Sequence, residues 1–289
     1  MEDDAGDSVG MTGVSVRAMT RSDIVAGLQL SRACKWNQIE DDWRCFLEFE
    51  GAGGYVAVRD TAPLGTIAFL RYPGAFRWIA MMLVDPQVRR AGIASLLMET
   101  ALDTLRDDGC IGLDATPEGE PLYRRYGFTD GYSLVRTKVV VNSEAFTPSH
   151  GIVRRMEPSD LPEVFARDRV LFGADRSALL ASFYHRAPEL AWFAEHGYCF
   201  GRPGYQYNQV GPIAAEDLDT ARDLLSHCLS AQHGRQFALD VPKHAVEWLR
   251  WMESVGFEIE RPFLRMYRGD HRDPGLPDWQ YGIAGPEFG

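Results

Sequence analysis

One stretch decides the fold: Val84-Asp85-Pro86-Gln87-Val88-Arg89-Arg90-Ala91-Gly92-Ile93-Ala94-Ser95. An apolar run over residues 78–84 precedes it, and apolar residues return at helical spacing from Ile93 to Leu105. A strand that enters a helix through such a turn exposes the first free N–H groups of the helix, which suit a phosphate anion. Gly92 and Ala94 leave the approach to the backbone open. The alternative is an ordinary strand-to-helix turn with two solvated arginines, because glycine-containing patterns give many false matches.

The same pattern of residues occurs twice along the chain. Val16-Arg17-Ala18-Met19-Thr20-Arg21-Ser22-Asp23-Ile24 is matched by Val153-Arg154-Arg155-Met156-Glu157-Pro158-Ser159-Asp160-Leu161. Further along, Leu113-Asp114 is matched by Leu239-Asp240, and Leu134-Val135-Arg136 is matched by Phe263-Leu264-Arg265. Matches in the same order predict two copies of one α/β unit of about 130 residues, a common domain size.

Each copy is expected to be an α/β unit with a mixed, mostly antiparallel sheet flanked by helices. In the first copy, strands are predicted at 14–19, 54–59, 65–71, 76–84, 110–115 and 132–141, and helices at 22–35, 40–49, 92–108 and 118–126. The predicted organisation is a flexible acidic segment over 1–13, a first domain over 14–145 and a second over 151–268. A Pro/Gly-rich tail over 269–289 is expected to lie over the surface or to be partly loose.

Composition excludes several classes of partner. The 289 residues carry a formal net charge of −11, which repels nucleic acid and anionic membranes. The longest apolar run is far too short to span a bilayer, and the acidic N-terminus is unlike a signal peptide. The five scattered cysteines form no CxxC pair and indicate reduced thiols, and no spacing typical of a zinc site occurs. A cytoplasmic protein with no metal, nucleic-acid or membrane partner is therefore expected.

Two motifs resemble a known superfamily. Arg89-Arg90-Ala91-Gly92-Ile93-Ala94 is similar to the [Gln/Arg]-x-x-Gly-x-[Gly/Ala] signature of the GNAT acetyltransferases, and Leu122-Tyr123-Arg124-Arg125-Tyr126-Gly127-Phe128 resembles their closing helix. The resemblance is specific over roughly residues 14–140, and over 151–268 it depends mainly on the internal repeat. As a whole the chain resembles bacterial tandem-GNAT proteins. The resemblance implies an enzyme that transfers an acetyl group from acetyl-CoA to the amine of a small molecule by direct transfer in a ternary complex. A homodimer is left open.

The resemblance also implies roles for particular residues. The pantetheine arm of acetyl-CoA would bind along the backbone of Met82, Leu83 and Val84, with an N–H near Leu83 facing the developing oxyanion. The pyrophosphate would be held by the backbone amides of Arg89, Arg90, Ala91, Gly92, Ile93, Ala94 and Ser95.

The catalytic candidates are Tyr123 and Asp114. Tyr123 stands four residues before Gly127, where the resemblance implies the general acid. A phenol with a pKa near 10 gives up its proton to a thiolate reluctantly, so hydrogen bonding to the leaving sulfur is the alternative role. The structural alternative is a packed aromatic side chain with its hydroxyl in water, and the catalytic role is favoured over it. The strand before the loop carries no carboxylate, so the general base is not identified. Asp114 could relay a proton, but a structural role is favoured because Asp240 occupies the same place in the second copy.

The second copy lacks both markers. After a strand predicted at 205–210, residues 211–219 contain three acids and no basic glycine turn, and Met252 stands where the first copy has Tyr123. A degenerate domain that shapes the acceptor pocket or provides an interface is expected. Two rival functions remain. One is a non-catalytic acyl-CoA-binding regulator or scaffold, and the other is a tandem-GNAT enzyme resembling mycothiol synthase, in which the second domain is the active one.

Overall fold

The computed structural model describes residues 11–74, 76–106, 109–148, 153–269 and 275–289. The first half contains β1 (Val14–Ala18), α1 (Ile24–Ala33), α2 (Glu40–Glu48), β2 (Gly53–Arg59), β3 (Ala62–Tyr72), β4 (Phe76–Val84), α3 (Ile93–Thr104), β5 (Cys110–Ala115), α4 (Glu120–Arg125) and β6 (Thr129–Val140). The second half contains β7 (Arg154–Arg155), α5 (Leu161–Phe172), α6 (Ser177–Arg186), β8 (Trp192–Ala194), β9 (Gly197–Arg202), β10 (Asn208–Ala215), α7 (Leu218–Ser230), β11 (Gln236–Pro242), α8 (Val246–Ser254) and β12 (Glu258–Arg268). The tail adds β13 (Gln280–Gly282). The expected mixed α/β class is confirmed. The segment expected to be flexible, 1–13, lies outside the described residues up to position 10.

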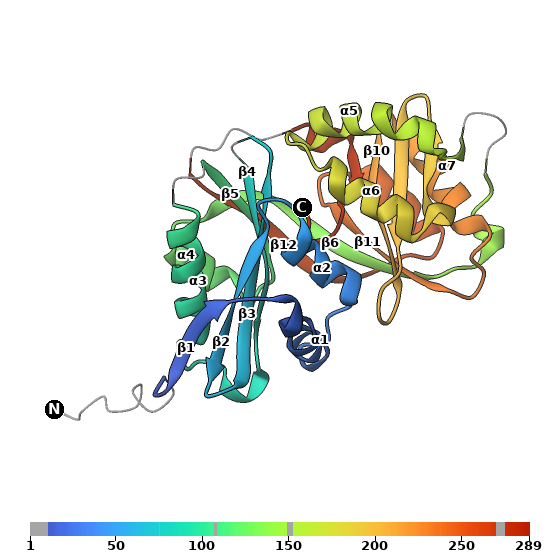
Figure 1. The fold of residues 1–289 in the computed structure, drawn as a ribbon. Coiled ribbons are helices and arrows are strands. Elements are labelled where there is room, and N and C mark those ends of the chain that lie inside the picture. The colour runs from blue at the N-terminus through green and yellow to red at the C-terminus, as the bar shows by residue number, and fades with distance from the viewer. Residues whose placement is uncertain (1–10, 75, 107–108, 149–152, 270–274) are drawn as a thin grey trace.

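One sheet runs through both halves. Its strand order is β1-β2-β3-β4-β5-β12-β6-β11-β10-β9-β8-β7, with β13 beside β10. The pairs β4–β5 and β10–β11 are parallel, and the other pairs are antiparallel. In Figure 1, α3 and α4 lie on one side of the first-half strands, and α1 and α2 lie on the other side, toward the second half.

The two halves exchange their last strands. β12 of the second half lies between β5 and β6, and β6 of the first half lies between β12 and β11. Each half therefore completes its sheet with the strand that the repeat assigns to the other half. The two copies are joined through the centre of one sheet, and neither half has a complete sheet of its own.

Two buried ion pairs explain why aspartate and arginine recur in the repeat. Arg265 donates from Nε and Nη2 to the two carboxylate oxygens of Asp114, both at 2.8 Å. Arg136 does the same for Asp240, at 2.8 and 2.7 Å. Each pair joins a residue of one copy to a residue of the other. The repeated residues thus stabilise the strand exchange.

The first repeated motif forms a local ion pair at the start of each half. Arg17 donates to both carboxylate oxygens of Asp23, at 2.9 and 2.7 Å, and the N–H of Thr20 donates to the same carboxylate at 2.8 Å. These contacts, led by the hydrogen bond from Arg17, lower the pKa of Asp23 to about 2. Arg154 and Asp160 repeat the pair at 2.7 Å. In both halves the pair connects the first strand to the first helix.

The last part of the C-terminal tail, residues 280–289, lies in the core, which corrects the expectation of a surface or loose segment for these residues. Leu276 and Trp279 are exposed, and residues 270–274 lie outside the described residues. Phe288 is fully buried and stacks on Phe46 of α2, with ring centroids 5.5 Å apart. The hydroxyl of Tyr72 donates to the carbonyl of Phe288 at 2.6 Å, and Nε1 of Trp78 donates to the carbonyl of Pro286 at 3.0 Å. Figure 1 accordingly shows the C-terminus in the middle of the molecule. Glycine and proline predicted irregular backbone correctly, but the apolar side chains among them decide where that backbone lies.

Candidate functional site

A groove opens where β4 and β5 separate. The two strands pair from Phe76–Cys110 to Trp78–Gly112, and their register ends there. Beyond that point lies a groove of about 890 Å³. The residues that the resemblance assigned to acetyl-CoA all line it: Met82, Leu83, Val84, Arg89, Arg90, Ala91, Gly92, Ile93, Ala94 and Ser95. Tyr123 lines it as well.

The start of α3 points free backbone donors at this groove. Gly92 caps the helix with φ +81°, a left-handed conformation that glycine adopts without strain. The first helical bond is donated by the N–H of Leu96 to the carbonyl of Gly92, at 3.1 Å. The N–H groups of Ile93, Ala94 and Ser95 precede that bond and have no acceptor within the helix. Their position at the positive end of the helix dipole suits an anion.

Arginine side chains surround the groove. Arg89 and Arg90 are exposed beside the start of α3, and Nη2 of Arg89 lies 3.6 Å from Sγ of Cys34. Arg125 of α4 and Arg261 of β12 line the same groove. Burial, and after it the charge of nearby Arg136, lowers the pKa of Arg261. A partly buried cation in this state is stabilised by an incoming anion.

β4 carries a bulge beside the groove. Leu83 pairs with Thr66 and Ala80 with Ala68, so Met81 and Met82 together oppose a single residue of β3. Met81 has φ +52°, a conformation that costs a non-glycine residue about 1–2 kcal/mol. The hydroxyl of Thr66 holds it by donating to the carbonyl of Met81 at 2.9 Å. Bulges of this kind redirect a strand next to active sites.

Tyr123 lies on α4 at the inner end of the groove. Its side chain is buried, and a Cβ on Gly119 would lie 2.9 Å from the tyrosine ring, so the glycine makes room for it. The ring packs edge-on against Phe128, with centroids 6.1 Å apart. Burial raises the pKa of Tyr123 to about 12. The hydroxyl therefore stays protonated at neutral pH and can donate a hydrogen bond.

A smaller inner pocket of about 40 Å³ adjoins the groove. It is lined by Trp36, Asn37, Gln38, Ile79, Ala80, Met81, Met82, Leu113, Asp114, Thr116, Tyr123, Arg136, Arg261, Phe263, Pro286 and Glu287. Five of these residues also line the groove, namely Trp36, Met82, Thr116, Tyr123 and Arg261, so the two cavities meet there. The first half, the exchanged strands and the tail all contribute walls to the inner pocket.

Asp114 is in the wall of the inner pocket but is committed to Arg265. Its side chain is fully buried, and both of its oxygens accept hydrogen bonds from that guanidinium. Burial raises the pKa of Asp114, and the charge of Arg265 opposes the rise. The structure thus places Asp114 in the same kind of pair as Asp240, which accords with the structural role.

The second half has an equivalent cleft, and the tail fills it. β10 and β11 pair from Asn208–Phe237 to Val210–Leu239 and then separate, as β4 and β5 do. Strand β13 pairs with β10 beyond that point, and the N–H of Ile283 donates to the carbonyl of Asp240 on β11 at 3.0 Å. β10 spans Asn208–Ala215, which corrects the strand predicted at 205–210 because the chain stays extended through Gly211 and Pro212.

Helix α7, which follows this cleft, is capped at its start by the carboxylate of Asp217. The carboxylate of Asp217 accepts from the N–H of Thr220 at 2.7 Å, and this bond is the largest cause of the lowered pKa of Asp217. Glycine occupies the corresponding position at α3. Met252, the counterpart of Tyr123, is fully buried. A ligand phosphate at this helix would meet a carboxylate where α3 offers open backbone.

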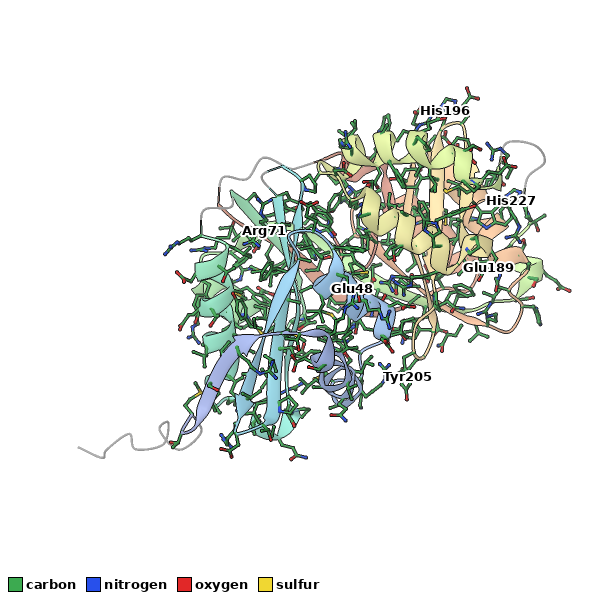
Figure 2. The ribbon with its side chains drawn as sticks, in the orientation of Figure 1. Glu48, Arg71, Glu189, His196, Tyr205 and His227 are labelled. Carbon is green, nitrogen blue, oxygen red and sulfur yellow. The ribbon has the colours of Figure 1, made fainter. Side chains whose placement is uncertain are left out.

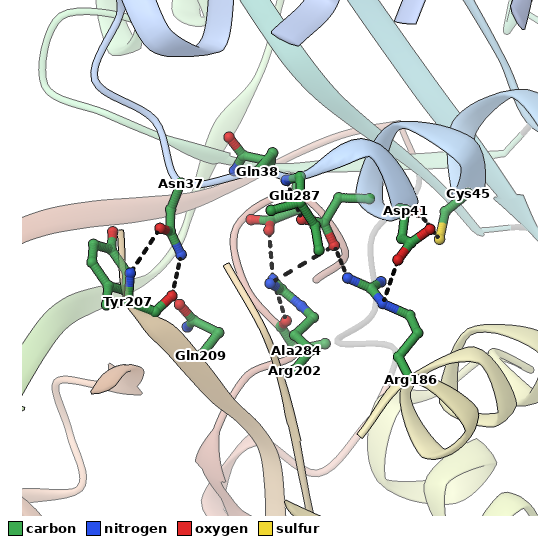
Figure 3. A network of polar contacts seen from close by, with 12 residues as sticks. Asn37, Gln38, Asp41, Cys45, Arg186, Arg202, Tyr207, Gln209, Ala284 and Glu287 are labelled. Atoms are coloured by element: carbon green, nitrogen blue, oxygen red, sulfur yellow. Dashed lines mark hydrogen bonds and ion pairs between the residues drawn. The ribbon is translucent and has the colours of Figure 1, made fainter. Parts of the chain in front are cut away.

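Sequence reasoning missed four residues of the two cavities: Trp36 and Arg261 where the cavities meet, and Gln38 and Glu287 in the inner pocket. They come from a loop, an exchanged strand and the tail, and no local motif connects them. A loop of the second half helps to position the first of these segments. Arg32 of α1 lies 3.5 Å from the centroid of the ring of Tyr205, which Figure 2 labels. Asn37 donates to the carbonyl of Tyr207 at 2.9 Å (Figure 3).

Three further observations concern metal sites, membrane-spanning helices and disulfide bonds. In the described ranges, no group of three or more His, Cys, Asp or Glu side chains is placed to hold a metal ion. Figure 2 shows His196 and His227 apart from each other in the second half. None of the helices in the described part of the chain has both the length and the apolar character that crossing a bilayer requires. None of the five cysteines is in a disulfide bond.

Comparisons with known proteins match both halves. A model of the acetyltransferase (GNAT) family matches residues 25–128, and a model of an acetyltransferase (GNAT) domain matches residues 164–282. Among curated proteins, the holothin acyltransferase of Pseudoalteromonas sp. (strain SANK 73390) is 24% identical over 243 residues, 81% of each chain. A solved structure from Pyrococcus horikoshii has a TM-score of 0.82 at 22% identity, over 96% of each chain. A tandem GNAT protein from the clavulanic acid biosynthesis pathway has a TM-score of 0.62 at 12% identity, over 90% of this chain and 100% of that one.

Proposed function

Because the chain belongs to the GNAT acetyltransferases and carries one GNAT domain in each half, we propose that its first half transfers an acetyl group from acetyl-CoA to the amine of a small molecule. The observation that carries this proposal is the groove between β4 and β5, which opens onto the start of α3 at one place and onto Tyr123 at another. The second half has the same cleft with β13 in it and a carboxylate at its helix start. The first half is therefore the catalytic one.

The groove suits acetyl-CoA along its length. The free N–H groups of α3 and the guanidinium groups of Arg89 and Arg90 would hold the pyrophosphate. The separated edge of β4 would bind the pantetheine arm through its backbone. The thioester would then reach the junction with the inner pocket, where the amine arrives from the other side. A backbone N–H near Leu83 would polarise the thioester carbonyl.

Tyr123 would assist departure of the sulfur. Its pKa of about 12 lies well above that of a thiol, near 8.5, so full proton transfer to the thiolate is uphill. A hydrogen bond from the hydroxyl to the sulfur stabilises the negative charge that develops as the carbon–sulfur bond breaks. This role needs a protonated phenol, which the buried position maintains.

Tyr123→Phe tests this assignment. We expect kcat to fall about 100-fold, while the KM for acetyl-CoA stays within about twofold, because the hydroxyl acts mainly in the transition state. Thiol release from acetyl-CoA across a panel of amines measures both constants. Tyr126→Phe is the matched control, since the hydroxyl of Tyr126 donates to Glu99 at 2.8 Å instead of facing the junction. Full activity in Tyr123→Phe would remove the tyrosine from the mechanism, and acetyl-CoA binding without turnover of any amine would favour the regulator.

Direct transfer makes its own kinetic prediction. Both substrates must be bound together, so double-reciprocal plots at several amine concentrations should intersect. Parallel lines, with labelled acetyl found on the protein, would indicate a covalent intermediate instead. A titration with acetyl-CoA should saturate at one molecule per chain. Two molecules per chain, or binding unaffected by Arg89→Glu, would contradict the assignment to the first half.

A further inference from the structure

We propose that Gln38 and Glu287 together bind the acceptor's amino group in the inner pocket, and that the acceptor enters as a primary ammonium ion. The inference deepens the proposed function and rests on it. Both side chains line the inner pocket, and Figure 3 shows them next to each other. One comes from the loop after α1 and the other from the last residues of the chain.

Gln38 offers an unsatisfied acceptor. The residue is 6% exposed, and its Oε1 is a buried atom without a hydrogen-bond partner among the described residues. A buried polar atom left in this state is costly, and most native proteins avoid it. Its backbone carbonyl is already engaged, because Arg32 donates to it at 2.8 Å. The side chain is therefore free to accept from a ligand N–H in the pocket.

Glu287 offers a carboxylate held in place from behind. Oε1 accepts from Nη2 of Arg202 at 2.5 Å, and the same nitrogen donates to the carbonyl of Ala284 at 3.2 Å. Gly285, with φ +119°, permits this approach, since a Cβ there would lie 2.6 Å from Nη2 of Arg202. Arg202 thus binds one oxygen of Glu287 and leaves Oε2 as the atom available to the pocket.

The carboxylate of Glu287 shares its hydrogen-bonded cation with a second carboxylate. Nη1 of Arg202 lies 4.0 Å from Oδ1 of Asp42, which also accepts a hydrogen bond from Arg186 at 2.8 Å. The charge of Arg136 acts on Glu287 as well. Figure 3 shows Arg202 beside Glu287. The charge of Arg202 is thus divided between two carboxylates, and an ammonium ion at Oε2 would give Glu287 a further direct partner.

The other charged walls of the inner pocket do not compete for that cation. Asp114 is neutralised by Arg265, and Arg136 by Asp240. Arg261 is shared with the groove, where its charge acts on the carboxylate of Glu118. An amide oxygen and a carboxylate oxygen match the donors of an ammonium group, and a pocket of about 40 Å³ admits a head group of that size.

Binding of n-propylammonium to the protein saturated with coenzyme A tests the inference without turnover. n-Propanol is the neutral probe of the same shape, and the dissociation constants are measured by calorimetry or ligand-observed NMR at pH 7. We expect the wild-type protein to prefer the ammonium ion. Gln38→Met should weaken ammonium binding about 3- to 10-fold and Glu287→Gln at least about 10-fold, with propanol binding unchanged. Glu189→Gln makes the same charge change at an exposed site in the second half and should change nothing.

The two variants separate recognition from folding. Gln38→Met breaks no hydrogen bond of its side chain to the described residues and removes a buried unsatisfied atom, so its melting temperature should equal or exceed that of the wild type. The inference would be overturned if both variants bound n-propylammonium as tightly as the wild type, or if the wild type preferred n-propanol. Coenzyme A that fails to bind the wild-type protein would overturn the proposed function instead.

Discussion

Asp114→Asn should destabilise the protein strongly and leave its chemistry nearly intact. The substitution keeps the shape of the side chain but leaves the charge of Arg265 buried, with a side-chain exposure of 3%, against an amide that can offer only one oxygen. Breaking a buried pair from one side costs about 3–5 kcal/mol. Replacing both partners, as in Asp114→Leu with Arg265→Met, removes the uncompensated charge. The double variant should lose less than either single variant, apart from about 1 kcal/mol for the hydrogen bond from Arg265 to the hydroxyl of Tyr132.

Urea unfolding of Asp114→Leu, Arg265→Met and the double variant measures the coupling free energy between the two side chains. Thiol release well below the melting temperature measures kcat per folded molecule. Asp240→Asn is the matched control, because Asp240 makes the same bidentate pair with Arg136. The two asparagine variants should lose similar stability, and kcat should stay within about threefold of the wild type in both. A 100-fold loss of kcat confined to Asp114→Asn, with stability preserved, would refute the structural assignment and restore Asp114 as a catalytic candidate.

Three further predictions concern the first half. The pKa of Asp23 is lowered to about 2 from 3.8, chiefly by Arg17, so the stability it contributes is present above its unfolded pKa and is lost as the pH falls toward 2. Asp23→Asn should therefore cost about 2 kcal/mol in urea unfolding at pH 6 and almost nothing at pH 2, and a cost that does not vary with pH would contradict this. Gly92→Asp should weaken acetyl-CoA binding at least about 100-fold, because its carboxylate would repel the pyrophosphate at the start of α3. The control Gly234→Asp, at a similar φ of +75° and in open space, should leave this binding unchanged. Equal losses of affinity in the two variants, measured by calorimetry, would rule out the anion site at α3. Cys34 is the one cysteine of the five that is not buried, so a thiol reagent should label it first, and acetyl-CoA should slow that labelling at least about tenfold; labelling indifferent to acetyl-CoA would place the ligand elsewhere.

Local patterns predicted the elements of the first half well. The strand over Phe76–Val84 has the predicted bounds, and α3 begins directly after Gly92, as the turn chemistry required. The residues assigned to acetyl-CoA line one groove because they are close in sequence and share one strand-to-helix turn. Their binding role stays a prediction until a ligand is measured.

The strand exchange could not be predicted in the same way. β6 and β12 carry similar motifs, Leu134-Val135-Arg136 and Phe263-Leu264-Arg265, so either strand satisfies the pattern that the neighbour of β5 requires. Pairing between strands is decided by contacts far apart in sequence, which a repeat leaves ambiguous. The tail posed the opposite difficulty. Its composition predicted a surface or loose segment, and only the buried positions of Ile283 and Phe288 show that residues 280–289 belong to the core.

The position of β12 and the tail has a consequence for how the enzyme matures on the ribosome. Domains of a growing chain usually fold from the N-terminus as they emerge. Here β5 receives its neighbour from Glu258–Arg268, and the inner pocket receives Glu287, which follows β12 in the sequence. The first half is translated before the second, but its sheet and its inner pocket are complete only after β12 and Glu287 have emerged. Synthesis that stops before β12 would therefore release a first half with the Arg89–Ala94 turn but without the strand beside β5 and without one wall of its pocket.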